Sequence, residues 1–556
     1  MNQNKVNFET LLYGIIFVLA LLVRFIHLGQ PPLNQYEAVP ALQALSISRG
    51  QETMMGDQPA YVMLTAGLFR VMDANDFLAR FWPTFIGAGI VWVAFLLRKR
   101  LPGRTGLIAA LFLAVDPALV AISRTAGGQS LTVVFGLLAA VLLFERKWII
   151  GGVLLGLAIA GGVSFWLGLM ILLIILILML PGGTPFSTAG SFKNREWFAG
   201  VAALTAVAVS TGLFAFPNGI SGIGSGLVSF INRWDSISIV PIEAALTVFA
   251  VTYFPLLILA GFGYFLCRRQ HPVISRILFV WFITATLLVV MLPGREISDW
   301  VWAVFPLVGF ASLGIDQFLR RVSESNRPVL IGEIVLTVSL IIFSILNLLA
   351  YFFNSYGDAV VDRNRLIGAG LPILLLMIMT AFLAWGWSPR SALQGLGLGL
   401  GLLLCVAFFS AGMKSTGNFS QVSAIAWKPQ SIVVDEELLV RQVEELSLWN
   451  HGQREAIDIE VIHYDNPALH WALRSFSSVT WDLQYSQLET PSIIIAPDYQ
   501  QIGSTTLYRG QGITWAQYPS YSRMEFEQWV QWLFYRQAPV DEIRLVLYAR
   551  NDLFKQ

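Results

Sequence analysis

LLYGIIFVLALLVRFIHL (residues 11–28) is an apolar run that fixes the environment of the whole chain. An α-helix of about this length crosses the roughly 30 Å of hydrocarbon in a bilayer. Only Arg24 and His27 interrupt the run, and no small-residue cleavage site follows it. We therefore expect a retained first membrane span rather than a removed signal peptide.

Similar apolar runs recur along the chain, whose residues are 56% hydrophobic and only 13% charged. Soluble domains carry about a quarter charged residues, so lipid is the expected solvent. The sequence predicts a polytopic α-helical membrane protein with about thirteen transmembrane helices. The predicted spans are 11–28, 79–97, 105–122, 129–145, 148–163, 165–180, 197–216, 242–266, 276–293, 300–318, 328–353, 366–386 and 391–412.

The connecting loops differ in charge, and this difference predicts the orientation. With a cytoplasmic N-terminus, about sixteen Lys and Arg residues fall in inner loops and about eight in the longer outer loops, as the positive-inside rule favours. We expect a multi-pass protein of the plasma membrane whose C-terminal part is extracytosolic. The net charge of +1 gives no indication of a nucleic-acid partner.

Two outer loops and the C-terminal part contain most of the remaining sequence. The first outer loop (29–78) carries two amphipathic stretches typical of interfacial helices, and 217–241 is rich in glycine and serine, which favours a mobile, partly re-entrant segment. We divide the chain into a transmembrane domain (1–413) and a small extracytosolic α/β domain (414–556). Strands are predicted at 457–463, 492–498 and 543–550, and helices at 435–452, 466–476 and 522–536.

Several kinds of chemistry find no support in the sequence. It contains no Walker loop, GxSxG elbow, HExxH or dinucleotide-binding turn. Its two cysteines, Cys267 and Cys405, form no CxxC pattern, and its five histidines are scattered. We expect no metal site built from protein ligands. A divalent metal cofactor is possible, but nothing in the sequence supports one.

Glu37 lies just beyond the first span, after a double proline and Asn34. Two interpretations of its carboxylate are open. An acidic residue in the first turn stabilises a helix N-terminus. A carboxylate at the membrane surface can also accept a proton from an acceptor hydroxyl.

The same region resembles the class C glycosyltransferases of the protein O-mannosyltransferase and aminoarabinose-transferase type (family 39). The first span ends RF-x-x-L-G and is followed by P-L and an acidic residue. Further matches occur in the family's order: Pro59 and Tyr61, then Arg80, Pro83 and Gly87, then Ser123 and Arg124, and later Arg295 and Pro306. NPALHWALRSF (466–476) resembles a segment in the extracytosolic domain of a prokaryotic branch.

The resemblance implies transfer of a sugar from a polyprenyl-phosphate carrier, outside the cytoplasm, to a protein, glycan or lipid acceptor. It implies a carboxylate base in the first outer loop and basic groups that hold the lipid phosphate. Arg124 and Arg295 are our phosphate candidates, because arginine forms charge-assisted bonds to a phosphate leaving group. Snorkelling at the interface or pairing with a nearby carboxylate would explain them equally well.

The chain departs from the family pattern at two acidic positions. Tyr36 stands where the family has its usual base, an Asp, and Gln129 stands where a second acidic residue is common. A tyrosine with a pKa near about 10 is a poor base at neutral pH. Glu37 and Asp57 are therefore the candidate catalytic residues, with Tyr36, Tyr61 and Gln129 in support. Asp116, in a D-P-A sequence, is better explained as a helix-ending turn.

Three functions remain open from the sequence. The first is an extracytosolic glycosyltransferase. The second is a catalytically degenerate relative that acts in an envelope or glycan-assembly complex. The third is a transporter of a lipid-linked substrate, although no two-fold internal repeat is evident. The aromatic stretch 508–536 could bind sugars, but an amphipathic helix with a tryptophan-rich surface that rests on the membrane or on the helical bundle explains it more simply.

Overall fold

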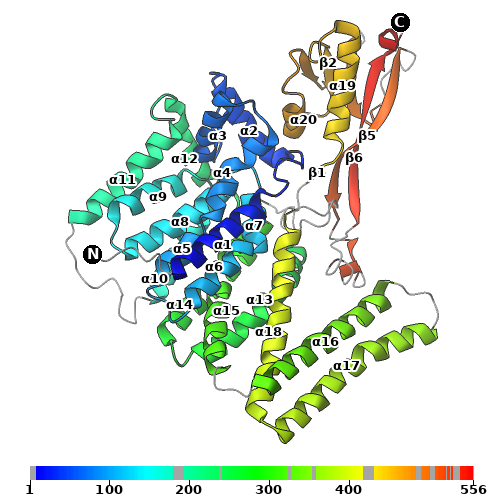
Figure 1. The fold of residues 1–556 in the computed structure, drawn as a ribbon. Helices are drawn as coiled ribbons and strands as arrows, with labels where there is room; N and C mark the ends of the chain where they lie inside the picture. Colours follow the sequence, from blue (N-terminus) through cyan, green and yellow to red (C-terminus); the bar gives the residue numbers. More distant parts are fainter. Residues whose placement is uncertain are drawn as a thin grey trace.

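The computed structural model describes residues 8–554 apart from 180–192, 237–240, 323–326, 354–358, 417–430, 484–489, 501–506, 521–522, 526–527, 530–531 and 533–538. A large helical bundle carries a sheet domain at one end (Figure 1). We call the side of the bundle that bears the sheet domain the outer side.

Each predicted span corresponds to an apolar helix or helix pair. Among the described residues, eight helices are long and apolar enough to cross a membrane by themselves. They are α1 (Phe8–Phe25), α4 with α5 (Asp76–Leu97), α13 (Ile242–Cys267), α14 (Pro272–Met291), η3 with α15 (Ile297–Val322), α16 (Arg327–Phe353), α17 (Ala359–Gly386) and α18 (Pro389–Lys414).

The other predicted spans correspond to a bent pair and to shorter helices. Helices α6 (Thr105–Val115) and α7 (Pro117–Ser123) meet at 52°, and the pair makes a ninth possible span. Asp116 caps α7 by accepting a hydrogen bond from Leu119 N, which confirms the predicted helix-ending turn. The shorter apolar helices are α8 (Gln129–Phe144), α9 (Trp148–Ile159), α10 (Ser164–Met179) and α11 (Lys193–Ser210).

The outer side carries three further α-helices. The two amphipathic stretches of the first outer loop form α2 (Gln35–Ser48) and α3 (Pro59–Val71), as predicted. The glycine-rich 217–241 segment, predicted to be mobile and partly re-entrant, contains η2 (Pro217–Ile220) and α12 (Ser221–Asn232). A Cβ at Gly222 would lie 2.8 Å from Gly56 O, so the glycines let this helix approach the first outer loop closely.

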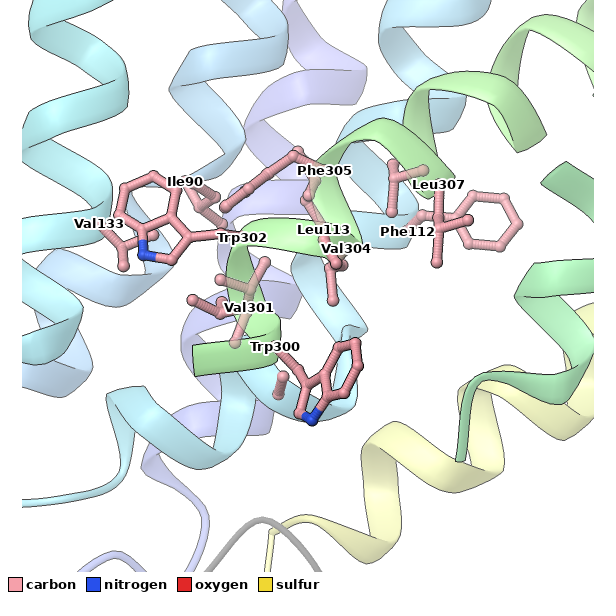
Figure 2. Close-up of a cluster of buried hydrophobic side chains, with 14 of the residues drawn as sticks. Ile90, Phe112, Leu113, Val133, Trp300, Val301, Trp302, Val304, Phe305 and Leu307 are labelled. Atoms are coloured by element: carbon pink, nitrogen blue, oxygen red, sulfur yellow. The ribbon is translucent and has the colours of Figure 1, made fainter. Parts of the chain in front are cut away.

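The core of the bundle gathers around the start of α15. Trp300, Trp302 and Phe305 belong to one buried cluster with Ile90, Phe112, Leu113 and Val133 from neighbouring helices (Figure 2). A Cβ at Gly263 of α13 would lie 2.0 Å from Phe310 O of α15. Close approach at small residues is how membrane helices gain packing energy.

Helices α16 and α17 form a long hairpin that projects from the bundle beside α18 (Figure 1). One of the polar contacts within the hairpin joins Thr380 Oγ1 to Glu333 Oε1. Both side chains are buried.

The sheet domain begins after α18, which ends at Lys414. Its six-stranded mixed sheet has the order β1-β5-β6-β4-β2-β3, with β2 parallel to β3 and β4 and the other pairings antiparallel. The strands are β1 (Ile432–Val433), β2 (Ile459–Ile462), β3 (Val479–Asp482), β4 (Ile493–Pro497), β5 (Tyr508–Pro519) and β6 (Val540–Arg550). Helices α19 (Glu436–His451) and α20 (Pro467–Ala472) complete the domain.

The predicted strands and the first two predicted helices of this domain are confirmed. The long strand β5 was not predicted, because Gly510 and Gly512 interrupt its alternation of polar and apolar residues. Part of the predicted helix 522–536 lies outside the described residues. Within it, Trp532 is fully buried and, with Trp529, packs in the same apolar cluster as the bundle core. The aromatic stretch therefore rests on the helical bundle at these two residues.

Candidate active site

Glu37 is placed by the start of α2. Asn34 is the N-cap of this helix, and its side-chain oxygen accepts a hydrogen bond from Glu37 N at 3.0 Å. In return, Glu37 Oε2 accepts from Asn34 N at 3.3 Å and from Asn34 Nδ2 at 3.0 Å. This reciprocal capping box satisfies helix-end donors, as the structural interpretation of Glu37 predicted.

The same carboxylate pairs with Arg80 of α4. Arg80 Nε donates to Glu37 Oε1 at 2.9 Å, and Arg80 Nη2 donates to Glu37 Oε2 at 2.8 Å. The remaining guanidinium donors bond the carbonyls of Leu28, Pro31 and Pro32. Arg80 is 2% and Glu37 3% exposed. The pair therefore ties the end of the first span to the first outer loop.

A second outer segment joins this network. Ala126 N donates to Glu37 Oε1 at 2.9 Å, so that carboxylate accepts at least five hydrogen bonds. Gly128 N donates to Gln58 Oε1 at 2.7 Å. The turn between α7 and α8 is thus bonded to both Glu37 and the residue beside Asp57.

Asp57 lies in the turn before α3 and is half-buried. Burial raises the pKa of its carboxyl group above the ordinary value, against the opposing effect of hydrogen bonds from its own backbone and from Gln58. A Cβ at Gly162 would lie 3.2 Å from Asp57 O, and one at Gly226 would lie 3.3 Å from it. Glycines on two other segments thus let the backbone pack closely around this acid.

Sequence reasoning missed a group of charged residues, one of which, Glu296, interacts with the charge of Asp57. Arg233, just after α12, forms a two-pronged ion pair with Asp299 of η3, and its Nε donates to Gly294 O at 2.8 Å. Both partners are largely buried. This link fastens the end of α12 to the segment between α14 and α15.

Glu296 belongs to that segment. Ser298 Oγ donates to Glu296 Oε2 at 3.0 Å, and the Glu296 side chain also caps Asp299 N. Part of its side chain reaches the surface, although protein atoms surround the carboxyl group. Desolvation raises the pKa of the Glu296 carboxyl group, Arg233 opposes this, and the charges of Asp299 and Asp57 raise it further. Asp57 and Glu296 are thus close enough for their charges to interact. The acidic residues in GREISD, directly before a span, were the available signal.

The predicted phosphate ligands lie at the outer ends of helices. Arg124, the C-cap of α7, donates from Nη1 to Arg24 O and Ile26 O, both at 2.7 Å. These bonds hold the end of α1. The Nε and Nη2 atoms of Arg124 make no hydrogen bond to any residue that the structure describes. They can therefore act as donors to an anionic ligand.

Arg295 lies next to Glu296 and is half-buried, with its Nη2 3.4 Å from Val290 O. Helix α7, which Arg124 caps, contacts η3, which follows Arg295 by two residues.

The three residues predicted to support the site differ in how far they are exposed to solvent. Tyr61 is fully buried, and its hydroxyl donates to Ala79 O at 2.8 Å, so it anchors α3 to α4. Tyr36 is 44% exposed beside Glu37. Gln129 is half-buried at the start of α8. Across the described ranges, no group of three or more His, Cys, Asp or Glu residues is arranged to hold a metal ion.

Other positions that carry the family resemblance belong to the framework. A Cβ at Gly87 would lie 2.3 Å from Ser123 Cβ, so only glycine permits this crossing of α4 and α7. Thr84 Oγ1 donates to Ser123 O, and Ser130 Oγ donates to Pro83 O. These residues fix the helices that surround the acids.

Solved structures share this architecture. The crystal structure of ArnT from Cupriavidus metallidurans bound to undecaprenyl phosphate matches with a TM-score of 0.55 at 13% identity, over 99% of this chain and 99% of that chain. The apo structure of the same protein matches with a TM-score of 0.51 at 14% identity, over 97% and 98%. The chain therefore has the fold of the class C glycosyltransferases.

The sequence comparison agrees with the fold. Residues 37–221 match the family of dolichyl-phosphate-mannose-protein mannosyltransferases. No curated protein sequence matches the chain. The family match and the fold together confirm the resemblance predicted from the sequence: the chain is a multi-pass membrane glycosyltransferase.

Proposed function

We propose that the protein transfers a sugar from a polyprenyl-phosphate donor to an acceptor hydroxyl or amine on the extracytosolic side of the plasma membrane. Asp57 carries this proposal. Its carboxyl group lies in the first outer loop, and the bond from Gly128 N to Gln58 fixes the neighbouring residue. The fold is shared with a protein whose crystal structure contains undecaprenyl phosphate.

In the proposed reaction, Asp57 accepts the proton of the acceptor as the acceptor atom attacks the anomeric carbon. The bond between that carbon and the phosphate oxygen breaks, and polyprenyl phosphate leaves with the electron pair. A raised pKa, caused by burial, makes Asp57 a stronger base than an exposed aspartate. Burial is the main cause of this raised pKa, and the negative charge of Asp57 in turn raises the pKa of Glu296.

Arg124 and Arg295 are proposed to bind the donor phosphate and stabilise its growing charge. Arg124 caps α7, which contacts η3, and Arg295 lies two residues before η3. Alanine at either position is expected to weaken the binding of undecaprenyl phosphate by the purified protein. Unchanged affinity in both variants would contradict this assignment.

Glu37 is the other candidate base from the sequence. It accepts at least five hydrogen bonds and pairs with Arg80, which stabilises its ionised form and lowers its basicity. We therefore assign Glu37 to loop placement and Asp57 to proton transfer.

The test is sugar transfer by purified protein supplied with a panel of polyprenyl-phosphate sugars. Asp57→Asn should lower kcat by about 10²–10⁴, as loss of a general base does. Asp73→Asn, at an exposed acid of the same loop, is the matched control. Saturable lipid binding without turnover by the wild-type protein would favour the degenerate accessory protein. Movement of the intact donor across vesicles would favour the transporter.

The proposal includes an orientation: cytoplasmic N-terminus, transmembrane domain 1–413 and extracytosolic domain 414–556. A cysteine at Asn450, an exposed position on α19, tests it in a variant without Cys267 and Cys405. We expect impermeant thiol reagents to label this cysteine on intact cells. Labelling only after cell lysis would contradict the orientation.

A further inference from the structure

Helix α20 of the sheet domain contacts the start of α4. Trp471 is fully buried, and its Nε1 donates to Asp76 Oδ1 at 2.6 Å. Its ring lies 5.9 Å from the ring of Phe69 in α3. Asp76 is the first residue of α4. A single indole thus joins the sheet domain to the turn between α3 and α4.

Arg474 reinforces this contact. Its guanidinium lies over the Trp471 ring, 4.3 Å from the ring centroid, and its Nη2 donates to Ala74 O at 3.3 Å. Cation–π contact of this kind stabilises a ring that is shielded from water. Two side chains from one short segment therefore hold the same turn.

A second bond joins α20 to the start of α2. Asn466 is the N-cap of α20, and its Nδ2 donates to Gln35 Oε1 at 3.3 Å. Gln35 is the first residue of α2 and lies two residues before Glu37. The sheet domain is consequently bonded to the first residues of both helices that supply the Arg80–Glu37 pair.

These contacts continue to Asp57 through bonds described above. Asp76 lies one helical turn before Arg80, which pairs with Glu37. Glu37 accepts from Ala126 N, and two residues later Gly128 N donates to Gln58. Every step is a hydrogen bond or a short stretch of helix or turn, so a displacement at Asp76 can reach the loop that carries Asp57.

We propose that Trp471 and Asn466 are positioning residues of the transferase, which hold α4 and α2 in register so that the Arg80–Glu37 pair keeps Asp57 in place. The sheet domain is then a working part of the enzyme rather than an appended module. The activity arm of the test rests on the proposed function, whereas the exchange arm below does not.

The test compares Trp471→Phe with Trp449→Phe in the full-length protein. Phenylalanine keeps an apolar ring but removes the N–H that Asp76 accepts. Trp449 is 70% exposed on α19 and makes a matched control within the same domain. Asn466→Ser keeps an N-cap oxygen but lacks the amide that donates to Gln35 and is too short to replace it, which separates loss of docking from loss of the helix cap.

Hydrogen exchange provides the readout that needs no reaction. We expect faster exchange over residues 35–58 in Trp471→Phe and Asn466→Ser, and no change there in Trp449→Phe. In transfer assays, kcat should fall at least about tenfold while the KM for the donor stays within about twofold, because misplacement of a catalytic group slows chemistry more than binding.

Two results would overturn the proposal. One is unchanged exchange over residues 35–58 in both docking variants. The other is a fall in kcat that follows only the loss of folded protein, with exchange altered uniformly over the chain. If the wild-type protein shows no transfer, the proposed function fails, and the exchange comparison still decides whether α20 positions the loop.

Discussion

Arg80 and Glu37 meet as a bidentate ion pair inside the protein, at 2.9 Å and 2.8 Å, although they lie 43 residues apart in the chain. The pair links α2 to α4, and Glu37 also accepts a hydrogen bond from Ala126 N in the next outer segment. Glu37, one of the two acids that the family resemblance made candidate bases, therefore holds three segments of the outer side together. Loss of the Glu37 carboxylate should therefore lower the stability of the fold more directly than it slows sugar transfer.

Glu37→Gln is expected to destabilise the protein strongly. The amide leaves the Arg80 guanidinium buried without a counter-charge, and removal of one partner of a buried pair costs about 3–5 kcal/mol. The thermal midpoint of the purified protein in bilayer nanodiscs measures this cost. Glu52→Gln, at an exposed acid of the same loop, is the control. Equal midpoints for the two variants would contradict the structural role of Glu37.

Gly87→Ala should also destabilise the protein, by about 1–3 kcal/mol, because the added methyl group overpacks the crossing of α4 and α7. The control is Gly67→Ala in α3, where a Cβ would meet nothing within 4 Å. Alanine there should stabilise the helix by about 0.5–1 kcal/mol. Shifts of the thermal midpoint in opposite directions are the expected result. Equal shifts would show that the crossing tolerates a side chain.

The membrane fold could be predicted because its signals are local. Apolar runs define the spans whatever the helices pack against. The D-P-A sequence at Asp116 predicted a helix-ending turn, which the hydrogen bond from Leu119 N to Asp116 confirms. Composition was less informative for 217–241, where it favoured a mobile, partly re-entrant segment but did not predict helix α12. Its glycines instead serve close packing of α12 against Gly56 and Pro59, a tertiary cause that composition does not reveal.

The site was harder to predict because its contacts are distant in sequence. Arg233 and Asp299 are 66 residues apart, and in the sequence each one looks like an ordinary charged residue of a loop. Glu296 gains significance only when the fold brings its segment towards Asp57. The capping of α2 by Asn34 and Glu37 could be predicted from the sequence, whereas the pairing of Glu37 with Arg80 became visible only in the folded structure.

Glu333→Ala should loosen the α16–α17 hairpin. Thr380 Oγ1 would lose its acceptor in a membrane interior, where an interhelical hydrogen bond contributes about 0.6–2 kcal/mol. Glu333→Gln keeps a side-chain oxygen and should retain most of the stability. Thermal midpoints and amide exchange over residues 359–386 measure the effect. Equal exchange in the alanine and glutamine variants would contradict the role of this bond.

Glu436 predicts a pH dependence of domain docking. It begins α19, and burial together with the charge of Asp76 raises the pKa of its carboxyl group to about 8, against the opposing charges of Arg474 and Arg80. Arg49 adds positive charge near Arg474. Because an undocked glutamate ionises near its ordinary pKa of 4.5, the docked state retains a proton that the undocked state has lost.

Docking is therefore most stable below pH 4.5, weakens as the pH rises to about 8, and changes no further above that value. Glu436→Gln stays uncharged, so it should remove this dependence and protect the docked state at pH 8. Amide exchange of α20 at several pH values measures docking. Glu437→Gln, at an exposed neighbour whose carboxylate pairs with Arg441, should keep the wild-type dependence. The same pH profile in both variants would assign the dependence to a group other than Glu436.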